Sequence, residues 1–249
     1  MNLKNHKPLI FALLAGVVGF CMRATLYRTG FDDKNILSAT HPLHLACVAL
    51  TLLTAAYLLL SLRGLSGSGD PAKNFPRSEV RSLAILGAAC LTLLHALALT
   101  RVSGNLMDRG RTVLAFAGAA SMFLCALPGS HRKARTLALG IITVFYALDM
   151  LCRYQAWSGN PQLPDYCFQI FACVLLSLCS YHRLAFSTGL GKRRMLLFCC
   201  LMSLTLCLMC AAGPETRVFY LGGAFWAVGC MCAIQPPAED AQEETDVPA

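Results

Sequence analysis

Residues 41–62 read HPLHLACVALTLLTAAYLLLSL and contain no Asp, Glu, Lys or Arg. An uncharged apolar run of this length suits a helix that crosses the hydrocarbon core of a bilayer. Thr40, a residue type that caps helices, precedes the run, and Pro42 falls in the first turn, where a missing N–H group costs nothing. The stretch therefore predicts a membrane-spanning helix.

Similar apolar blocks occur along the rest of the chain, at residues 8–27, 82–100, 112–129, 136–154, 167–183, 195–213 and 218–234. Only 14% of the 249 residues are charged, against about 25% in a typical soluble domain. We therefore expect an all-α, polytopic transmembrane bundle of about eight spans, with residues 1–234 forming a single domain. A bundle of seven spans, with the weak last block in a re-entrant hairpin, is the alternative.

The distribution of charge predicts how the chain lies in the membrane. With the N-terminus in the cytoplasm, thirteen of the 21 Lys and Arg residues fall on the cytoplasmic side and eight on the other. The positive-inside rule favours this arrangement, which places both termini in the cytoplasm. Residues 235–249 contain five acids, three prolines and no Lys or Arg, a composition typical of a disordered tail.

The net charge of +8 does not indicate binding to nucleic acid, because the basic residues lie between apolar blocks and form no single basic face. Membrane lipids are the expected surroundings. The 14 cysteines lie within the apolar blocks or at their edges, so we interpret them as small buried apolar residues and expect no disulfide framework. Short loops and the lack of N-x-S/T sites favour a bacterial plasma membrane.

Ionisable residues inside the apolar blocks are the strongest candidates for a site, because charges at membrane depth are costly and usually face a protein interior. In the expected topology they converge in the outer half of the membrane. We predict a polar pocket there that binds an anionic or zwitterionic group, formed by Arg23, Arg28, His41, His44, His95, Asp149 and Arg153. The alternative is that the arginines extend to the interface and that Asp149 only pairs with Arg153.

A second hypothesis concerns thiols in the last two blocks. In an antiparallel hairpin four of them lie at similar depth, namely Cys199, Cys200, Cys230 and Cys232. Thiolates select Cu(I) and other soft metals, so these residues are candidate ligands. Ordinary packing of apolar cysteines is the alternative, and no other cofactor is expected.

Three classes of function fit this sequence. The first is a transporter, or its binding subunit, for a small solute or a lipid. The second is a non-catalytic partner or sensor subunit that assembles with other membrane protein subunits. The third is an intramembrane enzyme acting on a lipid-linked substrate, with Asp149 or His95 as acid or base. Since no P-loop, H-E-x-x-H or G-x-G-x-x-G motif occurs, we favour a protein without catalytic activity.

Overall fold

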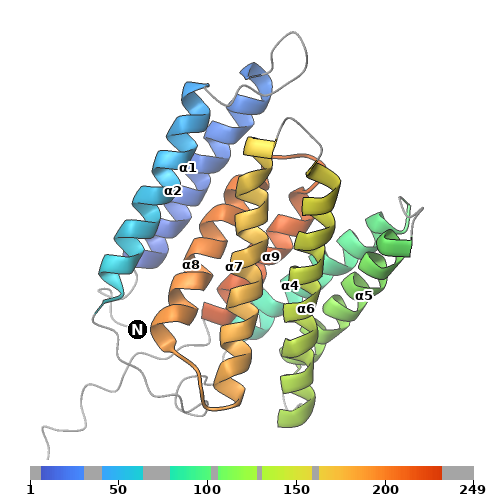
Figure 1. Cartoon of the computed structure of the whole chain (residues 1–249). Helices are drawn as coiled ribbons and strands as arrows, with labels where there is room; N and C mark the ends of the chain where they lie inside the picture. Colours follow the sequence, from blue (N-terminus) through green and yellow to red (C-terminus); the bar gives the residue numbers. More distant parts are fainter. Residues whose placement is uncertain are drawn as a thin grey trace, which may run out of the picture.

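The computed structural model describes residues 7–30, 41–63, 79–101, 106–127, 131–158 and 163–231. These ranges contain eight α-helices and no strand. In chain order the helices are α1 (Lys7–Thr29), α2 (Pro42–Ser61), α4 (Glu79–Leu99), α5 (Leu106–Ala126), α6 (Arg132–Trp157), α7 (Leu163–Ser187), α8 (Arg193–Cys210) and α9 (Arg217–Met231) (Figure 1). The acidic segment 235–249 lies outside the described residues.

Six of these helices are long and apolar enough to cross a membrane, namely α1, α2, α4, α6, α7 and α8. The predicted all-helical architecture is therefore confirmed, and it is compatible with an integral membrane location. The other two helices differ in length or charge. Helix α9 has 15 residues, which gives a length of about 22 Å, less than the roughly 30 Å of a bilayer core. Helix α5 carries Asp108, Arg109 and Arg111 near its start.

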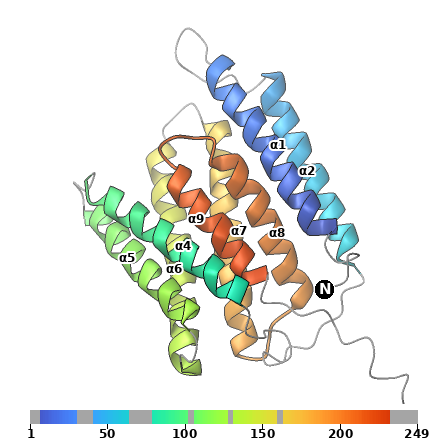
Figure 2. The ribbon, with the colours of Figure 1, turned by 180° about the vertical axis from the view of Figure 1, so that it is seen from behind.

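Helices α4 to α9 form a ring. Each packs against the next one in the sequence, and α9 packs back against α4 to close the ring. The hairpin of α1 and α2 lies outside this ring and packs against α8 (Figures 1 and 2). We name the two ends of the bundle after residues. Helix α6 ends at the Asp149 end, and helix α7 ends at the opposite end, the Arg183 end.

The outer surface of the bundle is rich in exposed apolar side chains. Leu52 is 65% exposed, Leu83 71% and Val113 68%. Large exposed apolar surfaces mark interaction with a membrane or a partner, and here they occur on several helices. Hydroxyl groups within the helices bond back to the backbone, as Thr51 does to the Cys47 carbonyl at 2.8 Å, which satisfies them without water.

Glycines allow the short helix α9 to pack closely against its neighbours in the ring. A Cβ atom on Gly229 would lie 2.6 Å from the Ile85 Cγ1 atom and 3.3 Å from the Ile85 backbone nitrogen of α4. A Cβ atom on Gly223 would lie 2.7 Å from the Leu176 Cδ1 atom of α7. Small residues let helix backbones approach in this way. The two glycines thus fix the distances from α9 to its neighbours.

Replacing Gly229 with Ala is expected to destabilise the protein by about 1–3 kcal/mol, because the added methyl group overpacks the contact with Ile85. The matched control is Gly140→Ala in α6, where a Cβ atom would meet nothing within 4 Å. That change is expected to be neutral or to stabilise the helix by up to about 1 kcal/mol. Unfolding of the purified variants in mixed detergent micelles measures both effects. Equal stability of the two variants would contradict the close contact of α9 with α4.

Candidate functional site

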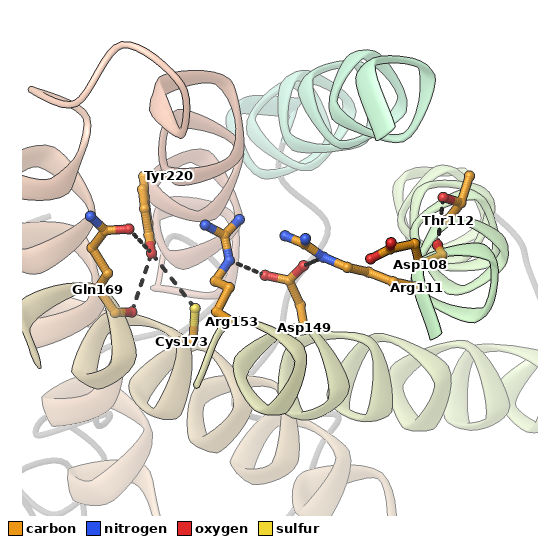
Figure 3. A network of polar contacts seen from close by, with 8 residues as sticks. All are labelled: Asp108, Arg111, Thr112, Asp149, Arg153, Gln169, Cys173 and Tyr220. Atoms are coloured by element: carbon orange, nitrogen blue, oxygen red, sulfur yellow. Dashed lines mark hydrogen bonds and ion pairs between the residues drawn. The ribbon is translucent and has the colours of Figure 1, made fainter. Parts of the chain in front are cut away.

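Asp149 lies at the centre of a buried charge network. Its side chain on α6 is 0% exposed. The Oδ1 atom accepts a hydrogen bond from Arg111 Nε of α5, and the Oδ2 atom accepts one from Arg153 Nε of α6, each at 2.5 Å (Figure 3). Arg153 follows Asp149 by four residues and so shares a face of α6. Two guanidinium groups therefore share one carboxylate.

The terminal nitrogens of the two arginines lie on the same side of the carboxylate (Figure 3). Each guanidinium group bonds to Asp149 through Nε, and no further hydrogen bond of either group occurs within the described residues. The Arg153 Cζ atom instead lies 4.3 Å from the ring centroid of Phe219 and 5.5 Å from that of Tyr220. Aromatic faces attract a guanidinium group without using its N–H donors. The terminal nitrogens of Arg111 and Arg153 are thus available to donate hydrogen bonds to a ligand.

Two further polar groups face Phe219. The His95 ring of α4 lies 5.0 Å from the Phe219 ring, and the Tyr146 ring of α6 lies 6.0 Å from it. Both side chains are buried. Among the described residues neither His95 Nε2 nor the Tyr146 hydroxyl group has a hydrogen-bond partner. Buried polar groups are usually satisfied, so these two groups add to the hydrogen-bonding capacity around Phe219.

Tyr220 connects this network to α7. Its hydroxyl group donates to the Gln169 backbone oxygen at 3.3 Å or to Gln169 Oε1 at 3.4 Å, and it lies 3.9 Å from Cys173 Sγ (Figure 3). All three residues are buried. The polar layer therefore continues from α5 and α6 through α9 to α7.

Arg23 of α1 brings a third guanidinium group to the Asp149 end, on the other side of α7. It is 1% exposed. Its Nη2 donates to the Tyr27 hydroxyl group at 2.5 Å, and its Nη1 lies 4.0 Å from Cys210 Sγ of α8. Its Cζ atom lies 5.0 Å from the Phe168 ring centroid, and the His44 ring lies 5.6 Å from the same ring. Arg23 and His44 therefore share the layer that contains Tyr220 and Cys173.

The structure separates the predicted site residues into two groups. The buried ones are Arg23, His44, His95, Asp149 and Arg153. The other two are Arg28, which is exposed, and His41, which is half-buried. His41 is the N-cap of α2, one residue after the cap predicted at Thr40, and its Nδ1 accepts a hydrogen bond from Leu43 N at 3.3 Å.

Sequence reasoning missed Arg111 as a site residue. It stands directly before the apolar block 112–129, so hydropathy alone places it outside the span. The helix begins earlier, at Leu106, and therefore carries Arg111 into the bundle. The other polar residues that the sequence did not single out are Gln169, Tyr146 and Tyr220.

Of the four thiols in the metal hypothesis, Cys230 of α9 and Cys200 of α8 each approach Cys179 of α7. The Sγ atoms of Cys200 and Cys179 lie 3.2 Å apart. Both are free thiols, as are Cys199 and Cys230, and Cys232 lies outside the described residues. Within the described part of the chain no group of three or more His, Cys, Asp or Glu residues is placed to hold a metal ion. Packing of apolar thiols accounts for the observed contacts.

A comparison of the chain with protein families, with curated proteins and with solved structures finds no match. The class of the protein therefore follows from its own architecture. It is an all-helical protein with six helices suited to span a membrane, and it contains a buried layer of charged and polar side chains at one end.

Proposed function

We propose that this protein is a transporter, or the binding subunit of one, for a small solute that carries a carboxylate or phosphate group. The acidic group of the solute binds at the terminal nitrogens of Arg111 and Arg153. The observation that carries the proposal is that two guanidinium groups, the buried one of Arg153 and the half-buried one of Arg111, contact a single buried carboxylate. An unbalanced charge at membrane depth is unfavourable by several kcal/mol, and a bound anion would neutralise it.

The chemistry of the arginines supports an acidic ligand. A guanidinium group is planar, always charged and presents donors in a fork that matches a carboxylate or a phosphate. Because Nε of each group is engaged by Asp149, the carboxylate fixes the direction of both tips. Arg111 has 18% of its side chain exposed, which supports access to the site from the Asp149 end.

The same geometry supports binding more than acid–base catalysis. A general base needs an oxygen or nitrogen free to take a proton within hydrogen-bond reach of a substrate. Both Asp149 oxygens already accept charge-assisted hydrogen bonds. The intramembrane enzyme is therefore the weaker candidate, and no catalytic role is proposed for Asp149.

We extend the proposal to the orientation of the chain. Seven described basic residues lie near the Asp149 end, namely Arg23, Arg28, Arg101, Arg109, Arg111, Arg153 and Arg217. Ten lie near the Arg183 end, namely Lys7, Arg63, Arg81, Arg132, Lys133, Arg135, Arg183, Lys192, Arg193 and Arg194. By the positive-inside rule this end faces the cytoplasm, and the solute site faces the opposite side. Eight spans, of which the short α9 is the last, together with cytoplasmic termini and a bacterial plasma membrane, complete this proposed arrangement.

A ligand screen by thermal unfolding tests the proposed function. Purified protein in mild detergent is heated with a panel of small carboxylates and phosphates, and with neutral analogues. A ligand at 100 times its Kd stabilises a protein by about 2.7 kcal/mol, so we expect an anion from the panel to raise Tm.

Arg111→Gln is expected to abolish the increase in Tm, because it removes one of the two guanidinium groups that bind the anion. The matched control Arg109→Gln replaces an exposed arginine of the same helix and is expected to keep the increase. Stabilisation of the Arg111→Gln variant to the same extent as the wild type would contradict the proposed site, and so would a panel without any stabilising anion.

A further inference from the structure

A separate hollow of about 300 Å³ lies between α1, α8 and α9. Phe20 of α1, Leu208 of α8 and Leu221 of α9 form apolar walls, together with Ala211, which follows α8. Arg217, the first residue of α9, contributes the charged group of the lining. The hollow is distinct from the Asp149 network, since none of these five residues contacts Asp149, Arg111 or Arg153 in the hydrogen bonds and ion pairs of that network.

The charged and apolar parts of the hollow are ordered along the bundle axis. Arg217 stands at the Asp149 end, and Leu221 lies four residues further along α9, about 6 Å deeper. On α8, Leu208 likewise lies deeper than Ala211, which follows the helix end at Cys210. The hollow is therefore charged at the end of the bundle and apolar toward its middle. A phospholipid in a bilayer has the same polarity, with its headgroup at the surface and its chains inward.

Arg217 is held beside the hollow. Its Nε donates to the Ala211 carbonyl oxygen at 3.1 Å, and no other hydrogen bond or ion pair of Arg217 occurs within the described residues. Its two terminal nitrogens can thus donate to an anion. The N-terminal end of α9 adds a partial positive charge, which favours a negative group at this position.

A second cation stands behind the wall of the hollow. Arg23 follows Phe20 by three residues on α1, and its Nη1 lies 4.0 Å from the Sγ atom of Cys210, the residue before Ala211. The volume of the hollow is at the lower end of the range for small-molecule sites, which suits a single hydrocarbon chain better than a whole lipid.

We propose that this hollow binds one acyl chain of an anionic phospholipid, with the lipid phosphate against Arg217. The site lies between α1 and α9, beside the end of α8. A lipid in this position would bridge α1 and α9, which both pack against α8.

Native mass spectrometry of the detergent-purified protein tests this site with three probes: phosphatidylglycerol, phosphatidylcholine and inorganic phosphate. We expect the wild type to retain one phosphatidylglycerol, to bind phosphatidylcholine more weakly and to bind inorganic phosphate not at all at the same concentration. Arg217→Gln is expected to weaken phosphatidylglycerol binding roughly tenfold, because a charge-assisted hydrogen bond is lost. Leu221→Phe, which fills the hollow, is expected to weaken binding of both lipids.

Two variants serve as controls. Arg28→Gln replaces an exposed arginine near the end of α1 and is expected to leave lipid binding unchanged. Arg111→Gln, which impairs the proposed solute site, is also expected to leave it unchanged, so the two proposals succeed or fail separately. Equal retention of both lipids by the wild type would overturn the proposal. The proposal would also be overturned if the Arg217→Gln variant bound phosphatidylglycerol as well as the wild type does, or if inorganic phosphate displaced phosphatidylglycerol from the wild type.

Discussion

Replacing Asp149 with Asn is expected to destabilise the protein by about 3–5 kcal/mol, the range found when one partner of a buried ion pair is removed. The change leaves Arg111 and Arg153 facing each other in the bundle without the carboxylate that both now contact. Unfolding in mixed detergent micelles measures the loss. The matched control Asp108→Asn, on a half-buried residue of α5, is expected to change stability by less than about 1 kcal/mol.

The stoichiometry of the network predicts an asymmetry between its members. Arg111→Gln leaves the one-to-one pair of Asp149 with Arg153 intact, so it is expected to destabilise the protein less than Asp149→Asn does. Replacing all three side chains by apolar ones, as in Arg111→Met, Asp149→Leu and Arg153→Met together, is expected to restore stability. If Asp149→Asn lowered the free energy of unfolding no more than Asp108→Asn does, the sharing of the Asp149 carboxylate by two arginines would be contradicted.

Replacing Trp226 with Ala is expected to destabilise the protein by about 3–5 kcal/mol, since it opens a large cavity in the ring. Trp226 of α9 is 1% exposed, and its indole N–H group donates to Ser180 Oγ of α7 at 2.9 Å. Trp226→Phe keeps most of the volume and loses the hydrogen bond, so the expected loss is about 1 kcal/mol.

Tryptophan fluorescence gives an independent measurement at this position, because the chain contains only two tryptophans. In a Trp157→Phe background, Trp226 is the only indole, and its emission is expected to be blue-shifted until the bundle unfolds. The Trp157→Phe variant also serves as the control for stability, since Trp157 is only half-buried and stacks on Tyr166. A red-shifted emission of the folded variant would contradict the burial of α9.

Hydropathy predicted the helices well because the signal is local. Each apolar block found in the sequence contains most of one helix, and the largest change in a start is that of α5, which begins at Leu106 rather than at residue 112. The polar residues Asp108, Arg109 and Arg111 lowered the apolar signal there. The last apolar block, predicted at residues 218–234, corresponds to α9, which the structure describes over Arg217–Met231.

The candidate site could be predicted only in part. The pairing of Asp149 with Arg153 is local, since four residues separate them on one helix. The contact of Arg111 with Asp149 joins α5 to α6 over 38 residues, and that of Arg23 with Cys210 spans 187 residues. Such contacts depend on how the helices are arranged in the ring. The sequence indicated the common depth of these residues but not their partners.

Native mass spectrometry of the wild type and of Arg111→Gln, purified in parallel in mild detergent, tests the central claim most directly. The claim is that the two arginines around Asp149 hold an acidic solute. We expect the wild type and the control Arg109→Gln to carry one small molecule with a carboxylate or phosphate group, and the Arg111→Gln variant to lack it. The claim would be contradicted if the wild type carried no bound acid, so that its mass differed from that of the Arg111→Gln variant only by the substitution.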